Sequence, residues 1–331
     1  MKSRSNEPLV SVIMPSYNCA NYIIHAIASV QAQTYTHWQL IIVDDCSTDE
    51  TPNLVKQICE PRLILLRNDK NSGPAESRNV GISAASGKYL AFIDADDTYE
   101  PDFLSKMVDA ANKFDADIVW CNYYEIDLNG NKKEVKSTLP KNQIFDYKQS
   151  LMSFFTGQKG LGSMWNKVYR RDFIEKFSIR LNEKRTRAED WEFNLDCFGK
   201  LNNMVVIDDC LYNYIRRNPG SVMASYREKD LPLMAESFTR LESLKLQLNL
   251  SCSGEYYINS FGQPLAEYLV KVCNHDINPL SKLKAVRRSA EYKMLRSHFN
   301  ICRLPKAYAL LMLLFDLHLF RLTKWFAIKV L

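Results

Sequence analysis

Acidic side chains gather directly after two strand-like runs in the first hundred residues. Asp44 and Asp45 follow the apolar run Leu40–Val43, and the acidic segment Asp94–Asp97 follows the run Tyr89–Ile93. Three carboxylates within four residues repel one another unless a cation or hydrogen-bond donors offset the repulsion. Magnesium and manganese prefer oxygen ligands, and a site with one or two carboxylates leaves positions for phosphate oxygens. The pattern therefore predicts a divalent metal that bridges a diphosphate.

A third polar segment, Pro15–Asn18, follows the run Val10–Met14. Each segment alone is more typical of a turn, since Asp, Asn, Ser and Pro are turn residues. Together they favour a ligand site, because ligands of open α/β sheets bind outside the carboxyl ends of the strands. The sequence has neither a G-x-x-x-x-G-K-[ST] loop nor a G-x-G-x-x-G turn after the first run, which argues against a P-loop NTPase and a dinucleotide-binding oxidoreductase.

Apolar spacing over residues 10–119 predicts an α/β sheet with crossover helices. Beyond a turn at Asp127–Gly130 the regular alternation is lost, and from about Leu231 the pattern is helical. The predicted strands are Val10–Met14, Leu40–Val43, Leu63–Leu66, Tyr89–Ile93 and Ile118–Tyr124. The predicted helices are Ile23–Val30 with Asn21 as its cap, Thr51–Ile58, Ala75–Ala84 and Pro101–Phe114.

Composition excludes several classes of protein. The chain has 331 residues and is 46% apolar, which supports a full core and excludes a disordered chain. Nine cysteines without a C-x-x-C pair signal neither a zinc site nor a disulfide framework, and a reducing cytosol fits best. The polar N-terminus leaves no room for a secretory signal, and the longest apolar run, Ala307–Phe315, is shorter than the roughly 20 residues that span a bilayer.

Four motifs together resemble the family 2 glycosyltransferases of the GT-A fold: Val10–Asn18, Ile42–Thr51, Asn71–Gly81 and Gly87–Asp97. Weaker matches follow at Trp165–Tyr169, Ala188–Asp190 and residues 214–221. The resemblance implies a GT-A, Rossmann-like mixed α/β sheet. It also implies an inverting transfer of a hexose or N-acetylhexosamine from a UDP-sugar to a hydroxyl of a glycan or lipid-linked acceptor, in bacterial surface polysaccharide synthesis.

The resemblance also assigns the donor site. Tyr17 is similar to the residue that stacks on uracil, and Asp45 to the acceptor of the uracil imide proton. Asp96 of the D-x-D motif resembles the ligand of a divalent metal, Mn²⁺ or Mg²⁺, and Asp97 is expected to share that duty. The full set implied to bind the nucleotide sugar is Pro15, Tyr17, Asp45, Arg78, Asn79, Asp94 and Asp96.

The resemblance makes Asp190, in the Glu189-Asp190 motif, the catalytic base that deprotonates the acceptor hydroxyl. The alternative is a helix N-cap, where aspartate is favoured. Trp165 and Lys167 are expected to shape the acceptor pocket or to contact phosphate, although a tryptophan in an aromatic region is equally typical of a core. Arg216, with Arg217 and Ser221, resembles a basic segment that meets the diphosphate, against a solvated loop.

These observations predict a GT-A domain over residues 1–225, with a nucleotide half at about 8–125 and an acceptor half at about 126–225. A helical, basic extension follows over residues 226–331. Of the net charge of +5, residues 282–331 hold eleven Lys and Arg against two acids, which is +9 and leaves −4 for the rest. The alternative to an enzyme, a catalytically silent GT-A scaffold at the membrane, is disfavoured because the motif acids are retained.

The chain end mixes the apolar run Ala307–Phe315 with basic and aromatic residues, namely Arg321, Lys324, Trp325, Phe326 and Lys329. This composition is typical of an interfacial helix on an anionic membrane, or else of a helix packed on the catalytic domain or in a dimer interface. A nucleic-acid partner is disfavoured because no recognition motif is present. We expect a cytoplasmic protein, peripheral on the inner face of the cytoplasmic membrane, and its oligomeric state stays open.

Overall fold

The computed structural model describes residues 7–154, 158–185, 188–216, 227–250 and 254–330. The chain divides into two compact units, one formed by Met1–Leu151 and Gln158–Arg217 and the other by Met152–Gly157 and Asn218–Leu331. The boundary predicted between residues 225 and 226 lies outside the described residues.

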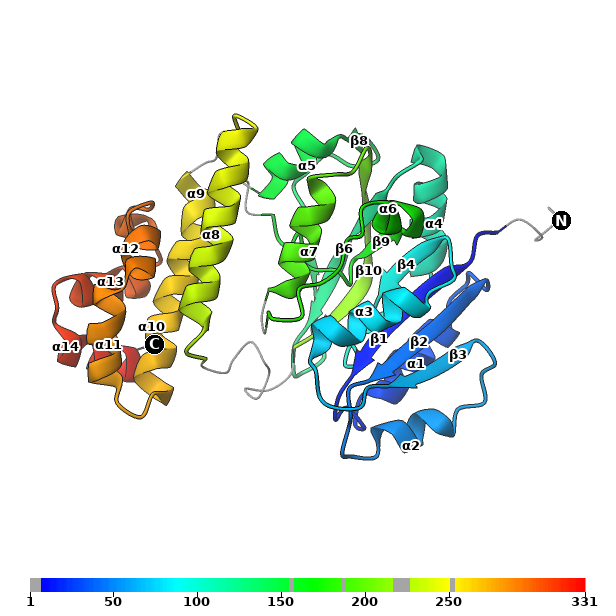
Figure 1. The fold of residues 1–331 in the computed structure, drawn as a ribbon, viewed down its shortest axis with the longest axis horizontal. Helices are drawn as coiled ribbons and strands as arrows, with labels where there is room; N and C mark the ends of the chain where they lie inside the picture. Colours follow the sequence, from blue (N-terminus) through cyan, green and yellow to red (C-terminus); the bar gives the residue numbers. More distant parts are fainter. Residues whose placement is uncertain (1–6, 155–157, 186–187, 217–226, 251–253, 331) are drawn as a thin grey trace. The chain divides into compact units, whose positions relative to one another are not determined.

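The first unit is built on one mixed sheet (Figure 1), which has ten strands in the described part of the chain. The strand order is β3-β2-β1-β4-β9-β6-β10-β5, with β7 paired to β6 and β8 to β10. The strands are β1 (Val10–Ser16), β2 (Trp38–Asp44), β3 (Leu63–Arg67), β4 (Tyr89–Phe92), β5 (Thr98–Tyr99), β6 (Ile118–Ile126), β7 (Lys132–Val135), β8 (Ile144–Phe145), β9 (Lys167–Arg170) and β10 (Met204–Ile215).

All five predicted strands are present, as β1 to β4 and β6. Strands β3, β2, β1 and β4 are parallel, as predicted, and their apolar runs are almost wholly buried in β1, β2 and β4. The sequence did not indicate β9 and β10, which return the chain to the same sheet. Strand β9 inserts antiparallel between β4 and β6, and β10 pairs parallel with β6.

Seven helices lie between these strands in the described residues: α1 (Ile23–Gln31), α2 (Thr51–Lys56), α3 (Pro74–Ala84), α4 (Phe103–Phe114), α5 (Tyr147–Phe154), α6 (Arg171–Lys176) and α7 (Glu189–Phe198). The division between the units falls within α5, after Leu151. The helix boundaries differ from expectation by one or two residues, and α2 ends at Lys56 instead of Ile58. Tyr22, not Asn21, is the N-cap of α1, and no side chain caps it. Helix α4 begins at Phe103 behind the N-cap Asp102, because Pro101 still belongs to the turn that follows β5.

Helix α3 lies against β1 and β2, and one glycine explains how closely it packs. A Cβ atom added at Gly81 would clash with the side chain of Ile13 on β1. The helix begins behind Gly73, whose φ of 92° suits glycine. This placement brings the first turns of α3 to the ends of the strands where the acidic motifs stand.

The second unit is helical in its described residues, as the sequence predicted. Its helices are α8 (Asp230–Gln247), α9 (Gly254–Tyr257), a π-turn (Ile258–Gly262), α10 (Gln263–His275), α11 (Pro279–Arg288), α12 (Ala290–Arg296), a 3₁₀ turn (Ile301–Arg303), α13 (Lys306–Asp316) and α14 (Phe320–Lys329). Helix α10 packs against α11, α13 and α14. None of the helices in the described residues is both long and apolar enough to cross a membrane.

Candidate functional site

A buried arginine joins three predicted site segments. The guanidinium of Arg78, on α3, pairs with Asp94 Oδ1 at 2.8 Å and with Glu189 Oε1 at 3.0 Å. Its side chain is only 10% exposed. A charged group this deeply buried is retained when it is paired, because otherwise its desolvation is not offset. Arg78 therefore ties the segment after β4 to the start of α7, across the middle of the candidate site.

Asp190 stands beside this ion pair on α7. Burial, followed by the neighbouring Glu189 charge, raises the pKa of Asp190 from its ordinary 3.8 to about 7, although Arg78 opposes the shift. Its Oδ1 accepts a hydrogen bond from the Trp191 amide at 2.8 Å. The N-cap of α7 is Ala188, so the alternative role of Asp190 as the cap is wrong. A carboxylate with a pKa near neutrality suits a proton acceptor.

Asp97 is held inside the protein. Its Oδ2 accepts a hydrogen bond from the Tyr212 hydroxyl at 2.8 Å, and its Oδ1 accepts one from the Ile215 amide at 2.8 Å. Burial, together with Asp94 and Asp96, raises the pKa of Asp97 well above its usual range. Because both oxygens are engaged with β10, this geometry argues against the metal duty expected of Asp97 and makes it a link between β10 and the segment after β4.

The acidic segment after β4 fits a divalent metal that takes few ligands from the protein. Across the described ranges, no group of three or more His, Cys, Asp and Glu side chains could hold a metal by itself. Asp96 is half-buried and lies between Asp94 and Asp97 in the sequence. Magnesium is commonly bound by one or two carboxylates plus substrate phosphates. The residues therefore fit a metal held by Asp96 and by diphosphate oxygens.

Asp45 is positioned by the segment that leads into α3. Its Oδ1 accepts hydrogen bonds from the Asn68 side chain at 2.8 Å and the Ser72 amide at 2.9 Å. Its Oδ2 accepts one from the Gly73 amide at 2.7 Å. The carboxylate is 3% exposed. These contacts fix its orientation at the carboxyl end of β2 and take up three of the roughly four positions at which a carboxylate accepts a hydrogen bond.

The turn after β1 brings Tyr17 near the same edge of the sheet. Pro15 pairs in register with Val43 of β2, which places the turn beside the end of that strand. Asn18 holds the turn, since its Oδ1 accepts a hydrogen bond from the Thr48 amide at 2.9 Å. Tyr17 is 47% exposed, so its ring is available for stacking on a flat ligand.

Asn79 is engaged by the protein itself. Its Nδ2 donates to the Leu181 carbonyl at 2.9 Å and to Glu183 Oε1 at 3.0 Å, and its Oδ1 accepts from the Leu181 amide at 2.9 Å. This amide ties α3 to the segment before α7. The geometry supports a role in positioning α3 rather than the nucleotide contact that the resemblance implies.

Lys167, on β9, is also placed differently from expectation. Its side chain is fully buried, and its Nζ donates to the Gly160 carbonyl at 2.8 Å and to Asn166 Oδ1 at 3.0 Å. Burial lowers the pKa of Lys167 to about 7. This placement argues against a phosphate contact, because the ammonium is directed at the preceding loop instead of at solvent.

Trp165 is part of an aromatic stack with strand β10. Its ring stacks on Tyr212 at 4.4 Å and on Tyr214 at 5.7 Å between centroids, with interplanar angles of 24° and 14°. Tyr212 also donates to Asp97, so the stack adjoins the acidic segment. The sequence did not single out Tyr212, because a tyrosine within an apolar strand gives no signal that separates it from ordinary core.

Arg216 lies at the end of β10 and is exposed. It pairs with Glu125 at 3.1 Å, and its amide donates to the Ile126 carbonyl. The other two residues of this predicted basic segment, Arg217 and Ser221, lie outside the described residues.

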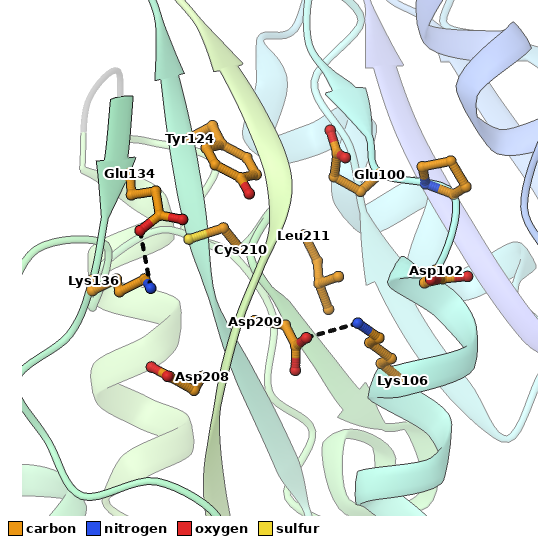
Figure 2. A pocket seen from close by; sticks show the side chains of 11 residues that line it. Glu100, Asp102, Lys106, Tyr124, Glu134, Lys136, Asp208, Asp209, Cys210 and Leu211 are labelled. Atoms are coloured by element: carbon orange, nitrogen blue, oxygen red, sulfur yellow. Dashed lines mark hydrogen bonds and ion pairs between the residues drawn. The ribbon is translucent and has the colours of Figure 1, made fainter. Parts of the chain in front are cut away.

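A separate pocket opens beside α4 and β10 (Figure 2). Lys106 points toward Asp209, with a distance of 2.7 Å between charged atoms, and Lys136 points toward Glu134 at 2.9 Å. None of the predicted site residues lines this pocket. Its acids are in part neutralised by these lysines, and it is distinct from the cluster around Arg78.

The fold is that of the GT-A glycosyltransferases. The chain superposes on the crystal structure of S. aureus TarS 1-349 in complex with UDP-GlcNAc with a TM-score of 0.62, at 18% identity. The superposition covers 97% of this chain and 90% of that one. Residues 11–178 match the model of Glycosyl transferase family 2, and the chain belongs to this family. The predicted fold class, including the helical C-terminal region, is confirmed.

Two bacterial relatives align with more than half of this chain. The chain is 38% identical over 234 residues to the Escherichia coli UDP-Glc:alpha-D-GlcNAc-diphosphoundecaprenol beta-1,3-glucosyltransferase WfgD, covering 71% of this chain and 83% of that one. It is 34% identical over 189 residues to the succinoglycan biosynthesis protein ExoO of Rhizobium meliloti (strain 1021). That match covers 56% of this chain and 54% of ExoO, so it spans about half the relative's length.

Proposed function

We propose that this protein is an inverting glycosyltransferase that moves a hexose or N-acetylhexosamine from a UDP-sugar to a hydroxyl of a glycan or lipid-linked acceptor, in bacterial surface polysaccharide synthesis. The observation that carries the proposal is the Arg78 bridge from Asp94 to Glu189, beside Asp190. The names of WfgD and of the TarS complex support a UDP-sugar donor, and that of WfgD supports a lipid-linked acceptor.

In this proposal Asp190 accepts the proton of the acceptor hydroxyl. The acceptor oxygen forms a bond to C1 of the sugar while the bond from C1 to the diphosphate oxygen breaks, and UDP leaves with that electron pair. Attack opposite to the leaving group inverts the anomeric centre. The raised pKa of Asp190 makes it a stronger base than an ordinary aspartate while leaving it partly ionised near neutral pH.

The donor is held by groups that the fold orients beforehand. The Tyr17 ring covers one face of the uracil, and the fixed Asp45 carboxylate accepts the imide hydrogen bond. Asp94, oriented by Arg78, faces the ribose. Asp96 would hold Mn²⁺ or Mg²⁺, and the bound metal would supply positive charge beside the departing diphosphate.

A nucleotide-binding panel tests the donor site. Thermal unfolding of the full chain is measured with UDP, GDP, CMP and TDP, each with and without Mn²⁺. We expect stabilisation by UDP that requires the metal, because a bound ligand stabilises the folded state by mass action. Stabilisation by a different nucleotide would mean that the donor sugar is carried by that nucleotide instead of UDP. No stabilisation by any of them would contradict the proposed activity.

An Asp96→Ala variant sharpens this test. If Asp96 holds the metal, the variant loses the metal-dependent part of UDP binding. Asp102→Ala is the matched control, since Asp102 is an exposed acid at the start of α4. UDP affinity that is the same for wild type and Asp96→Ala, with and without Mn²⁺, would contradict the role of Asp96.

We propose that the protein acts at the inner face of the cytoplasmic membrane, since a lipid-linked acceptor is embedded in a bilayer. The donor panel does not address this part of the proposal. It requires a surface of the protein that meets lipid.

A further inference from the structure

Helix α13 exposes apolar side chains on one stripe. Leu310 and Leu313 are each 42% exposed, and Leu317, directly after the helix, is 58% exposed. Their spacing of three and four residues places them on one face of a helix. The opposite side of α13 is buried in the second unit through Leu311, Met312 and Phe315. The helix is therefore apolar on both its packed and its outer side.

Helix α14 repeats this arrangement. Leu322, Trp325 and Ile328 follow one another at intervals of three residues and are 50%, 59% and 46% exposed. Thr323, Phe326 and Ala327 form its buried side. The helix packs against α13, and Leu319 in the short connection is exposed as well. Exposed apolar side chains therefore recur from α13, through the connection, into α14.

This concentration is specific to the end of the chain. Of the sixteen large apolar side chains that are exposed in the described residues, eight lie between residues 310 and 330. Scattered exposed apolar residues are ordinary, but a large contiguous group marks an interaction site. We name the group the α13–α14 surface, and it comprises Leu310, Leu313, Leu317, Leu319, Leu322, Trp325, Ile328 and Val330.

The charge around the α13–α14 surface is positive. The one acid between residues 303 and 330 is Asp316. Its carboxylate pairs with Arg296 at 2.7 Å and accepts a hydrogen bond from the Tyr292 hydroxyl at 2.6 Å, so its charge is already compensated within the unit. The same stretch holds five cations, Arg303, Lys306, Arg321, Lys324 and Lys329. Arg321 and Lys329 are exposed on α14 beside its apolar stripe.

We propose that the α13–α14 surface docks on an anionic lipid bilayer. Apolar side chains on such a surface enter the boundary between headgroups and acyl chains, tryptophan favours that boundary, and basic side chains attract anionic headgroups. A symmetric pairing of two copies through this surface would instead bring the exposed Arg321 and Lys329 of each chain close to those of the other. Charge complementarity therefore favours the lipid.

This docking gives the proposed glycosyltransferase access to a lipid-linked acceptor, and only that consequence rests on the proposed function. The docking itself is tested by binding alone. UDP binding is measured on the same samples. A failure of the proposed donor site is therefore distinguished from a failure of the proposed membrane docking.

The experiment is sedimentation of the full chain with vesicles of phosphatidylcholine, with and without phosphatidylglycerol. The test variant is Leu322→Glu with Trp325→Glu. The matched control is Leu246→Glu with Ile277→Glu, which puts two charges on exposed apolar residues of the same unit outside helices α13 and α14. All four positions are exposed, so the fold tolerates the charges.

We expect wild type and control to sediment with the anionic vesicles, and the test variant to bind them at least about tenfold more weakly. Arg321→Gln with Lys329→Gln should bind anionic vesicles several-fold more weakly and lose most of the salt dependence. Absence of wild-type binding, or equal binding by the test variant and the control, would overturn the proposal.

Trp325 supplies a second readout. Its exposed indole should shift its emission to shorter wavelength on anionic vesicles, and Trp325→Phe should remove that shift while the remaining tryptophans stay unchanged. Light scattering without vesicles gives the oligomeric state. A dimer that the Leu322→Glu, Trp325→Glu variant dissociates, with no vesicle binding by wild type, would assign the surface to a second copy of the chain and overturn the lipid assignment.

Discussion

The two units depart from ordinary burial in opposite directions. In the first unit the unusual residues are buried charges, such as Arg78, Asp97 and Lys167, of which Arg78 is 8% exposed and Lys167 is fully buried. In the second unit they are exposed apolar side chains, such as Trp325 at 59%. Both arrangements are unfavourable for an isolated folded chain, because buried charges lose hydration and exposed apolar groups order water.

The difference teaches where to look for ligands of different chemistry. The buried charges are held by partners within the protein, so they form a fixed polar site that suits a small charged ligand. The apolar residues of the α13–α14 surface are 42–59% exposed, so they suit a large apolar partner. The following predictions test whether each buried charge serves chemistry, stability or both.

Asp190→Asn should give the largest effect. The amide cannot accept the acceptor proton, so we expect turnover of a UDP-sugar to fall about a thousandfold. UDP affinity, measured by calorimetry, should stay unchanged because Asp190 does not contact the nucleotide in the proposed mechanism. Asp172→Asn is the matched control, since that carboxylate is 79% exposed on α6. Turnover near the wild-type rate would remove Asp190 from the role of base.

Arg78→Met should weaken the fold and the donor site together. The change leaves Asp94 and Glu189 without their shared partner, and breaking a buried pair of this kind costs about 3 kcal/mol. Urea unfolding measures this loss. Arg180→Met is the matched control, because Arg180 pairs with Glu175 at the surface, where their side chains are 32% and 41% exposed and such a pair contributes about 1 kcal/mol or less. Equal losses for the two variants would show that the Arg78 bridge is not an unusual stabilising contact.

Tyr212→Phe tests the buried Asp97 carboxylate. The variant keeps the ring that stacks with Trp165 but removes a hydrogen bond to a carboxyl group, which we expect to cost about 2 kcal/mol in the free energy of unfolding. Tyr89→Phe is the control, since its hydroxyl donates to the neutral amide of Asn112. Equal losses in the free energy of unfolding for Tyr89→Phe and Tyr212→Phe would mean that the hydrogen bond to Asp97 stabilises the fold no more than one to a neutral amide.

The sequence predicted the parallel strands well and the buried polar contacts poorly. Strands β1, β2 and β4 are apolar runs that end in polar motifs. Their positions in the chain, and the edge of the sheet that holds the site, could therefore be inferred from the sequence. The pairing of Tyr212 with Asp97 joins residues 115 positions apart, and no local pattern encodes it. The prediction for Lys167 was wrong because a fully buried lysine is rare and cannot be expected from its sequence. Strand β9 was missed because four residues are too few to show the alternation of a strand.

The smallest predicted effect concerns the pH dependence of stability. The folded protein raises the pKa of Asp190 from an ordinary 3.8 to about 7, so over that interval the folded state holds a proton that the unfolded state has lost. The free energy of unfolding contributed by this group is therefore fully present below the ordinary pKa and falls as pH rises through the raised one.

Asp190→Asn removes this titration, so the variant should be more stable than wild type above neutral pH, while the two should agree near pH 4. We expect a difference of about 1 kcal/mol, below what the whole shift would give, because Asp190 is only partly buried. Urea unfolding at several pH values measures it, with Asp172→Asn as the control that follows wild type. A variant that is less stable at every pH would mean that the ionised Asp190 stabilises the fold. Combined with the loss of turnover, the expected gain would show that this carboxylate is kept for chemistry at the expense of stability.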